Sequence, residues 1–547
     1  MILEYKFDYR SSSLVYEKIF LKQLKEYNLN GNILRNGFEL NFFIEADNLE
    51  KLEEFANTFS KNLPHSIFLY NIEASMVENM PTKQYKLIED KKLSLPPCPK
   101  CLNKIKDSYN IFTHCDICGY NSKGDNRNYQ IEFIETAQKI KKGKIIEINT
   151  FYGKYFVGIP SSICNNIDFD ILAYDLATVE KYTNIEEYEL KALASFEKPA
   201  IRLKKRLNFT IDYEDITAEL IRFRLPDDAI LYLLMQELHN IDIDTIFISK
   251  NKIETNDILL LNKIEDELKP IEIVASPKHI LIVKGDKGIP KLPISTENLN
   301  PQIDGFYSVI KEHNLYNKFK NMAGVNLCKD YANIIIQGEK FGLIEYLSFE
   351  TSFKSIKDIF SQIELTDKQA KKLLYNYKNK FPEHYKKILE INFKDNYFSI
   401  YQLWGIIAII LDFVDTTNPA EGAKILEENA MSFLGDRGPR IDYKLISKNG
   451  KPHFDPLMTI RTAISFKLAG VDELGLSYGV VESFLEFITN ELDELQQTMS
   501  IEAIIFTGSL LSNRRIFSKI SQEVSKNHKI FFNNEIILSS GEYGGRK

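Results

Sequence analysis

Two Cys-x-x-Cys motifs, Pro97-Cys98-Pro99-Lys100-Cys101 and Thr113-His114-Cys115-Asp116-Ile117-Cys118-Gly119, hold four of the six cysteines of the chain. Each motif predicts a tight knuckle that turns both of its sulfurs toward one ion, and Gly119 suits the turn after the second pair. Four thiolates at about 2.3 Å close a tetrahedral shell around Zn²⁺. Such a shell leaves no open position for a substrate, so the pattern predicts a structural zinc bound by Cys98, Cys101, Cys115 and Cys118.

The same cysteines have two other interpretations, a pair of disulfides or a redox-active Cys-x-x-Cys. Nothing in the sequence indicates secretion, and a redox motif does not need two copies, so zinc is favoured. His114 beside Cys115 is a further suitable ligand, but four cysteines suffice, which favours a place outside the zinc shell. Cys164 and Cys328 stand alone in the sequence, as is typical of buried thiols.

The composition restricts the class of protein. The 547 residues are enough for about three to four domains, and the hydrophobic fraction of 44% is typical of a soluble globular protein. The formal net charge of −7 gives no basic field, so we expect no nucleic-acid partner. Met1–Lys6 lacks the pattern of a leader, and the longest apolar run, Leu403–Leu411, is shorter than the ~20 residues of a membrane span. We therefore expect a cytoplasmic location without membrane contact.

The first 90 residues alternate strand and helix patterns. Alternating apolar and polar residues predict a strand over Ile2–Tyr9, and apolar residues at helical spacing predict a helix over Leu14–Tyr27. The succession β-α-β-β-α-β is typical of a ferredoxin-like fold. The remaining elements expected in this segment are strands at Ile33–Leu34 and Glu39–Ile44, a helix over Asn48–Asn62 and a strand over Ser66–Ile72.

A ferredoxin-like domain followed by a cysteine ribbon resembles the HypF family, the carbamoyltransferases of nickel–iron hydrogenase maturation. The ribbon keeps the family's Cys-Pro-x-Cys-Leu opening as Cys98–Leu102 and an aromatic residue, Phe112, before the second knuckle, although family members carry two cysteine quartets and this chain carries one. The resemblance implies a multidomain α+β and α/β architecture. Its expected parts are an acylphosphatase-like domain over 1–90, a zinc ribbon over 91–128, a YrdC-like domain over 129–290 and a carbamoyl-transfer domain of actin-like fold over 291–547.

In the first domain, the family's loop after the first strand is glycine-rich and carries an arginine that holds carbamoyl phosphate. The matching loop here, Tyr9–Ser13, has no glycine, and Arg10 is its only arginine. Arg35-Asn36 resembles the family's Arg-Asn pair, in which the asparagine orients a water. The resemblance thus implies Arg10 and Asn36 as catalytic candidates, with ordinary surface and turn residues as the alternative. Without glycines the backbone cannot approach an anion closely, which favours that alternative.

Residues 130–290 resemble a shortened YrdC-like domain, with Leu172–Ala177, Ala192–Leu203 and Arg224–Asp228 as the best-matching runs. In the family a Lys-Arg-Arg-Pro run before the first of these binds nucleotide phosphates, but the matching Ser161–Asn166 carries no cation. Later basic residues are candidates for phosphate binding, with a solvated surface as the alternative. They are Lys198, Arg202, Lys204, Lys205 and Arg206.

From about residue 290 onward the chain resembles the carbamoyl-transfer domain in several short motifs. Pro419–Ala423 resembles the family's Glu-Gly-Gln-Ala at a helix start, and Ile504–Arg514 resembles its strand-turn-helix run. The second pattern predicts a helix N-terminus that points at a ligand phosphate. The resemblance therefore implies ATP as a further ligand and a nucleotide site that comprises Glu421, Thr507, Gly508, Ser509, Asn513, Gly544 and Gly545.

The residues that carry the family's chemistry are largely replaced. The family's metal-binding histidine cluster corresponds to Gly338–Gly342, and its C-terminal metal-binding aspartate corresponds to Tyr543. Two hypotheses follow. The chain is either a HypF-like maturation protein that still handles a carbamoyl group or a nucleotide with altered residues, or a non-catalytic, zinc-stapled scaffold that binds a hydrogenase-maturation partner. The family resemblance favours the first hypothesis, and the lost residues favour the second.

Overall fold

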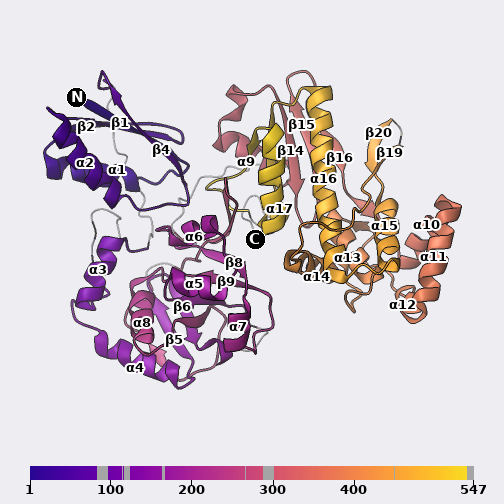
Figure 1. The fold of residues 1–547 in the computed structure, drawn as a ribbon, viewed down its shortest axis with the longest axis horizontal. Coiled ribbons are helices and arrows are strands. Elements are labelled where there is room, and N and C mark those ends of the chain that lie inside the picture. Colours follow the sequence, from indigo (N-terminus) through magenta and orange to yellow (C-terminus); the bar gives the residue numbers. More distant parts are fainter. Residues whose placement is uncertain are drawn as a thin grey trace. The chain divides into compact units, whose positions relative to one another are not determined.

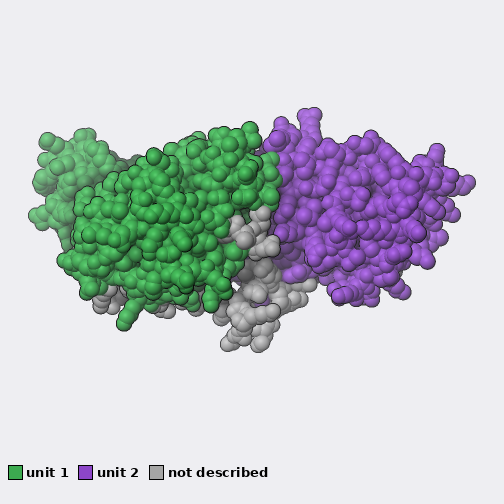
Figure 2. Space-filling model, turned by 90° about the horizontal axis from the view of Figure 1, so that it is seen from below, with its two compact units in different colours: residues 1–275, 282–293 green, residues 276–281, 294–547 purple. Residues whose placement is uncertain are grey.

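The chain divides into two compact units in the computed structural model, residues 1–275 with 282–293 and residues 276–281 with 294–547 (Figure 2). The structure describes residues 1–82, 96–113, 115, 124–162, 167–264, 267–287, 301–448 and 450–538. Among the helices of these ranges, none combines the length and the apolar character needed to cross a membrane. The boundaries of the four segments expected from the sequence remain predictions.

Unit 1 begins with a four-stranded antiparallel sheet of order β2-β3-β1-β4 and two helices. This order and the β-α-β-β-α-β succession confirm the ferredoxin-like fold predicted for this segment. The core is aromatic, and the rings of Phe7 and Phe42 meet edge to face with centroids 5.0 Å apart. The elements are β1 (Ile2–Tyr9), α1 (Val15–Tyr27), β2 (Asn30–Asn36), β3 (Glu39–Glu45), α2 (Leu49–Asn62) and β4 (Leu69–Val77).

The rest of unit 1 is built on a mixed nine-stranded sheet of order β11-β5-β6-β10-β7-β9-β8-β12-β13, of which β5, β6, β8 and β9 are labelled in Figure 1. Helix α8 is almost entirely buried and shares one hydrophobic core with β5, β6 and β10. The elements are α3 (Pro99–Ser108), α4 (Gln130–Lys141), β5 (Ile146–Thr150), β6 (Gly153–Gly158), β7 (Asp170–Ala173), α5 (Leu176–Tyr182), α6 (Glu187–Ala194), β8 (Ala200–Lys204), α7 (Leu207–Asp212), β9 (Leu220–Arg224), α8 (Ala229–His239), β10 (Thr245–Ser249), β11 (Ile258–Leu259), β12 (Glu272–Ala275) and β13 (Ile280–Lys284).

A buried glutamate joins the two sheets of unit 1. Glu197, which is 2% exposed, follows α6, and its carboxylate accepts hydrogen bonds from the hydroxyl of Ser66 and, at 3.2 Å, from the backbone N–H of Ile67. The backbone N–H of Phe196 also donates to the carbonyl of His65 at 2.9 Å. Burial raises the pKa of Glu197. Because water is excluded here, losing these hydrogen bonds would leave buried polar groups unpaired, which is costly.

Unit 2 is built on a five-stranded sheet of order β16-β15-β14-β21-β22 with helices packed around it. The apolar run Leu403–Leu411 falls in the buried helix α13 and its C-cap. The elements are α9 (Pro301–Glu312), β14 (Asn321–Leu327), β15 (Ala332–Gly338), β16 (Gly342–Ser348), β17 (Thr351–Ser352), α10 (Ile356–Thr366), α11 (Lys368–Lys380), α12 (Pro382–Ile388), β18 (Tyr397–Phe398), α13 (Ile400–Ile410), α14 (Pro419–Ser432), β19 (Leu445–Lys448), β20 (Lys451–Phe454), α15 (Pro456–Leu468), α16 (Glu473–Met499), β21 (Ala503–Thr507), α17 (Arg514–Lys519), α18 (Ser525–Asn527) and β22 (Ile530–Phe531).

A carboxylate of α9 binds the backbone that directly follows β22. Glu312 accepts hydrogen bonds from the backbone N–H groups of Asn534 and Glu535 at 2.9 and 2.8 Å. Burial raises the pKa of Glu312 to about 7, and the nearby carboxylate of Glu535 acts in the same direction. The neutral form of Glu312 is therefore favoured in the folded state.

We predict that wild-type unit 2 loses stability as the pH rises from about 4.5 to 7, by an amount on the order of 2–3 kcal/mol, because Glu312 must ionise in a poorly solvated place. Glu312→Gln removes this titration. Its melting temperature should fall less steeply over that pH range than that of the wild type in differential scanning calorimetry. Equal slopes for the two proteins would contradict the prediction.

Candidate functional site

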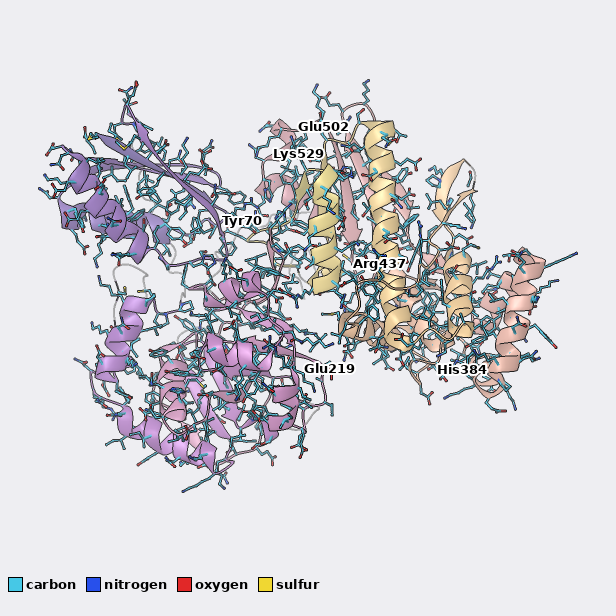
Figure 3. All side chains as sticks on the ribbon, in the orientation of Figure 1. Tyr70, Glu219, His384, Arg437, Glu502 and Lys529 are labelled. Carbon is cyan, nitrogen blue, oxygen red and sulfur yellow. The ribbon has the colours of Figure 1, made fainter. Side chains whose placement is uncertain are left out.

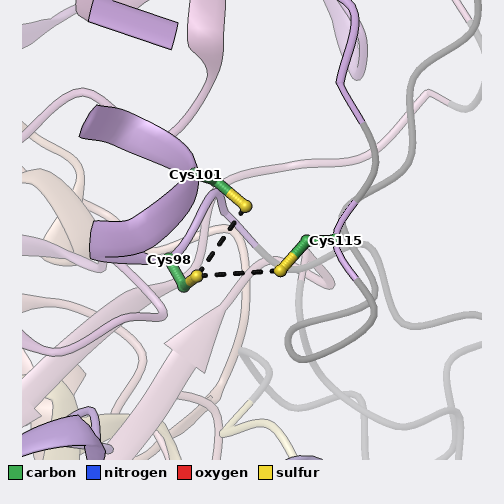
Figure 4. Close-up of side chains that lie close together, drawn as sticks. All are labelled: Cys98, Cys101 and Cys115. Carbon is green, nitrogen blue, oxygen red and sulfur yellow. Dashed lines mark hydrogen bonds between the residues drawn. The ribbon is translucent and has the colours of Figure 1, made fainter. Parts of the chain in front are cut away.

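Three of the four predicted zinc ligands converge. Cys98 is the N-cap of α3, Cys101 lies in the first turn of that helix, and Cys115 approaches from the following loop (Figure 4). The Sγ atom of Cys98 lies 3.7 Å from that of Cys101 and 4.0 Å from that of Cys115. Thiolates around a tetrahedral Zn²⁺ lie about 3.8 Å apart, whereas a disulfide bond is about 2.05 Å long. The cluster can therefore hold a metal ion.

The cysteine cluster is part of the hydrophobic core that includes α8, since all three thiols are buried in it. The ring of Phe112 covers Gly124, where an added Cβ would lie 2.2 Å from the ring. Tyr109, at the end of α3, donates a hydrogen bond to Glu237 of α8 at 2.5 Å. A metal bound by these cysteines would therefore fasten the ribbon to the nine-stranded sheet.

The other two candidate ligands, Cys118 and His114, lie outside the described residues, so the composition of the complete shell stays a prediction. Cys164 also lies outside them. Cys328 is fully buried beside the β14–β15 hairpin, as the sequence predicted. Burial raises the pKa of this thiol.

Arg10, a candidate for anion binding, is engaged by its own domain. Its Nε and Nη2 atoms donate to the carboxylate of Asp8 at 3.1 and 3.0 Å. Its guanidinium lies over the ring of Tyr70 on β4, 3.8 Å from the centroid. Tyr70 is labelled in Figure 3. The backbone N–H of Arg10 donates to the carbonyl of Phe68 at 2.8 Å. An anion in this loop would have to displace these contacts.

Arg35 closes the same loop from the other side. Its guanidinium donates to the carbonyls of Ser11 and Ser13 and to the carboxylate of Glu17 at 2.8 Å. Because Glu17 is completely buried, removing Arg35 would strand a charge, at a cost of about 3–5 kcal/mol. Asn36, the other catalytic candidate, is exposed on the β2–β3 hairpin.

The predicted turn after β21 exists, and the β14–β15 hairpin packs directly against it. Gly508 has a φ of 111°, and an added Cβ there would lie 2.3 Å from the backbone of Leu327. The hydroxyl of Thr507 donates to Asn326, and the hydroxyl of Ser509 accepts a hydrogen bond from the backbone of the hairpin at 3.0 Å. The polar groups expected to contact a phosphate thus have partners inside the unit.

Asn513 lies close to these residues and is tied to α14. Its amide donates to Glu427 at 3.1 Å, and Glu427 also binds the ammonium group of Lys329 and the hydroxyl of Tyr401, both at 2.9 Å. The structure therefore brings Asn513, Thr507 and Ser509 to one place. Glu421 is not part of this cluster, because its carboxylate accepts hydrogen bonds from the loop before α14.

The other motifs of unit 2 that resemble the family occupy packed positions or turns. Gly422, beside Glu421, packs so closely on Gly405 of α13 that an added Cβ would lie 2.6 Å from the Gly405 carbonyl oxygen. The segment Gly338–Gly342, which stands where the family has histidines, forms the β15–β16 turn. Gly544 and Gly545 lie outside the described residues.

A charged pocket of about 360 Å³ on the nine-stranded sheet was not predicted from the sequence. Strands β6, β7, β8, β9, β10, β12 and β13 contribute to its lining. Four cations and three acids line it, which gives a formal net charge of +1. They are Arg222, Lys250, Lys269 and Lys284, and Asp168, Asp170 and Glu272.

Most of these charges are paired within the wall of the pocket. Arg222 donates to Asp170 at 2.6 Å, and Lys284 lies 2.9 Å from Glu272. Lys250 is different, because its ammonium group donates only to the carbonyl of Leu268, at 2.8 Å, and burial lowers its pKa. Neither Lys250 nor Lys269 forms an ion pair within the described part of the chain, so both are available to an anion.

A buried ion network adjoins the pocket through Asp170, which belongs to both. Arg224 lies 3.3 Å from both Asp170 and Asp227, and Lys287 lies 2.9 Å from Asp227. Burial alone would lower the pKa of Arg224, but Asp227 raises it above its ordinary value. Burial also raises the pKa of Asp228 to about 6, although Asp228 accepts hydrogen bonds from two backbone N–H groups.

The basic residues expected to bind phosphate do not line this pocket, although Arg202 lies beside its wall residue Glu272. Arg202 lies 3.7 Å from Glu272, the buried ammonium group of Lys205 donates to the carbonyl of Ile216 at 2.8 Å, and Arg206 donates to the carbonyl of Glu180 at 2.8 Å. The sequence did contain a pattern that points to the charged pocket. Arg222-Phe223-Arg224 alternates within a strand, which places both arginines on one face of the sheet.

Comparison with solved structures identifies the fold of this chain. Full-length HypF in its phosphate- and nucleotide-bound form matches with a TM-score of 0.64 and 14% identity, covering 99% of this chain and 97% of that one. HypF from T. kodakarensis matches with a TM-score of 0.68 and 12% identity, with the same coverage. The chain thus has the fold of HypF over nearly its whole length, which confirms the expected mixed α/β multidomain class.

A relative by sequence is also known. Protein HydE of Wolinella succinogenes is 25% identical over 536 residues, covering 94% of this chain and 95% of HydE. No protein-family model matches the sequence.

We predict that the purified protein carries about one Zn²⁺ per chain and that Cys101→Ser releases it. Because the cluster is part of a hydrophobic core, the variant should also lower the melting temperature of unit 1. Cys328→Ser is the matched control, since it alters a buried thiol in unit 2 and should leave the zinc content unchanged. Elemental analysis that finds no zinc in protein purified without chelators would refute the prediction.

Proposed function

We propose that this chain is a HypF-like hydrogenase-maturation protein that binds a small anion-bearing ligand, a carbamoyl compound or a nucleotide, in the charged pocket of unit 1. The observation that carries the proposal is the presence of Lys250 and Lys269 in the pocket wall without ion-pair partners in the described chain. The fold shared with HypF, one structure of which contains phosphate and nucleotide, supports the same ligand class.

The pocket is suited to binding and orienting such a ligand. Its volume falls in the range of small-molecule sites, about 300–1,000 Å³. Glu267 and Asp286 already act on Lys250 without forming an ion pair among the described residues, and a phosphate or carboxylate group in contact with it would raise its pKa further. Asp168 and Asp170 can accept hydrogen bonds from the amide of a carbamoyl group, since carboxylates are strong acceptors.

In this proposal the cysteine cluster, completed by Cys118, holds a structural zinc and takes no part in chemistry. When bound, that zinc would supply only structural stability. The partner is another protein of hydrogenase maturation, and the protein works in the cytoplasm. The domains follow the expected boundaries at residues 90, 128 and 290.

A second candidate function, the non-catalytic scaffold, is favoured by two other observations. Arg35 and Glu17 close the loop of the first domain, and Lys329 and Glu427 close the turn of unit 2. Both clusters satisfy internally the groups that an anion would need. Under this hypothesis the protein would present its surfaces to a partner and would bind neither ATP nor a carbamoyl compound.

Ligand binding separates the two functions. We predict that AMP, ATP or carbamoyl phosphate at millimolar concentration with Mg²⁺ raises the melting temperature by a few degrees, as mass action requires. Lys250→Gln should abolish the shift, whereas Lys386→Gln, an exposed lysine of unit 2, should retain it. If none of the three compounds shifts the melting temperature of the wild type, the result contradicts ligand binding and favours the non-catalytic scaffold.

We further predict that the protein neither releases phosphate from carbamoyl phosphate nor cleaves ATP to AMP in a carbamoyl-dependent reaction. Each lost charge-stabilising group costs about 10²–10³ in rate, and the clusters around Arg35 and Glu427 are closed by internal hydrogen bonds. Either activity above a buffer blank, lost in Arg10→Ala or Glu421→Ala, would identify the protein as an enzyme.

A further inference from the structure

Helix α11 is strongly basic, because Lys368–Lys380 contains five lysines and no acidic residue. Four of the lysines recur at spacings of three, four and seven residues, which places them along one face of the helix. Tyr375 lies in the middle of that face and is 65% exposed. We call this face the lysine stripe, and it consists of Lys368, Lys371, Lys372, Tyr375 and Lys378.

The opposite face of α11 packs against the rest of unit 2, so the lysine stripe faces solvent. Ala370, Leu374 and Tyr377 are buried, and the hydroxyl of Tyr377 donates to the carbonyl of Ile410 at the end of α13. His384 of the adjoining helix α12 contacts the same carbonyl at 3.1 Å (Figure 3). Helices α10, α11 and α12 form a cluster at one end of unit 2, with α15 between it and α16 (Figure 1).

The lysines of the stripe have no acidic partner among the described residues, although neighbouring cations do. Arg461 lies 2.9 Å from Asp367, and Lys387 lies 2.5 Å from Asp415. Lys380, at the end of α11, donates to the carbonyl of Leu468 at 2.8 Å. The stripe is therefore a row of four exposed lysines without an ion-pair partner in the described part of the chain, although the ammonium group of Lys378 lies over the ring of Tyr385, 5.9 Å from its centroid.

This arrangement is unfavourable for the helix itself. Lys368 is the first residue of α11, and Lys371 and Lys372 follow within the next turn, where the helix dipole is positive. The pair Lys368 and Lys372 also places like charges four residues apart, which destabilises a helix. Local rules of this kind are broken chiefly where a residue serves function rather than stability.

We infer that the lysine stripe is a docking site for an extended acidic segment of a partner protein. From Lys368 to Lys378 the stripe is about 15 Å long, which an extended peptide of about five residues covers. Carboxylates spaced along that peptide would pair with the lysines and would remove the repulsion within α11. Tyr375 supplies an apolar contact in the centre, a residue type enriched in protein interfaces.

A protein segment fits this surface better than a nucleic acid. The stripe is only one helix wide, and the exposed acids Glu364 and Glu383 on α10 and α12 and Glu390 just beyond them belong to the same helical cluster. A longer polyanion would meet these acids as well as the lysines, and the chain as a whole carries a net charge of −7. A short acidic segment avoids that repulsion.

The test measures binding of a fluorescein-labelled decaglutamate peptide to the full-length protein by fluorescence anisotropy at 50 mM salt, a chosen low ionic strength at which ion pairs are weakly screened. Combining Lys371→Gln, Lys372→Gln and Lys378→Gln should weaken binding on the order of tenfold. The matched control combines Lys141→Gln, Lys142→Gln and Lys144→Gln at the end of α4, which removes the same charge from another exposed surface. It should weaken binding less than twofold. Tyr375→Ala should also weaken binding, without a change in charge.

The melting temperature of the triple stripe variant provides a second measurement. It should be equal to or higher than that of the wild type, since repulsion within α11 is removed. Equal peptide binding by wild type and stripe variant, an equal loss in the α4 control, or tighter binding of a 20-nucleotide single-stranded DNA than of the peptide would overturn the inference. A wild-type dimer that becomes monomeric in the stripe variant would assign the surface to a second copy of the chain and would overturn it too.

Discussion

A charge taken out of water needs an opposite charge or several hydrogen bonds, and this constraint shapes the buried polar clusters of both units. In the first domain it couples Arg35 to the buried Glu17 and so shuts the loop after β1. In unit 2 it couples Lys329 to Glu427 beside the turn after β21. In the nine-stranded sheet the same constraint has a different result. The paired ions adjoin a pocket, and Lys250 and Lys269 in the pocket wall have no ion-pair partner among the described residues, so they can bind an anion.

The cysteine ribbon shows how a small segment gains stability from a larger one. A ribbon of this size has too little apolar surface for a core of its own. Here Cys98, Cys101 and Cys115 share a core with α8, together with Ile105 of α3, and the Tyr109–Glu237 hydrogen bond fixes the same contact. The described part of the ribbon is therefore built into the same core as the nine-stranded sheet.

Local patterns in the sequence predicted the first domain, and the resemblance to the HypF family supplied the expected architecture of the rest. Period-two and helical spacing predicted the elements of the first domain, and the spacing of the cysteines predicted the convergence of Cys98, Cys101 and Cys115. The sites were less predictable, because their character depends on contacts between distant residues. The closure of the Gly508 turn requires the backbone of Leu327, and the pocket combines Arg222 with Lys250 and Lys284 from different strands. No local pattern contains such pairings, although the alternation of Arg222 and Arg224 was a clue.

The pairing of β14 with β21 has a consequence for biosynthesis. These two parallel strands are neighbours in the five-stranded sheet, yet Asn326 and Thr507 are separated by 181 residues. During translation one edge of β14 therefore stays unpaired until β21 has been synthesised. An unpaired strand edge is a template for association with other chains. We therefore expect the sheet of unit 2 to form only once β21 is present, and a chain truncated before β21 to expose an aggregation-prone edge that β21 covers in the folded unit.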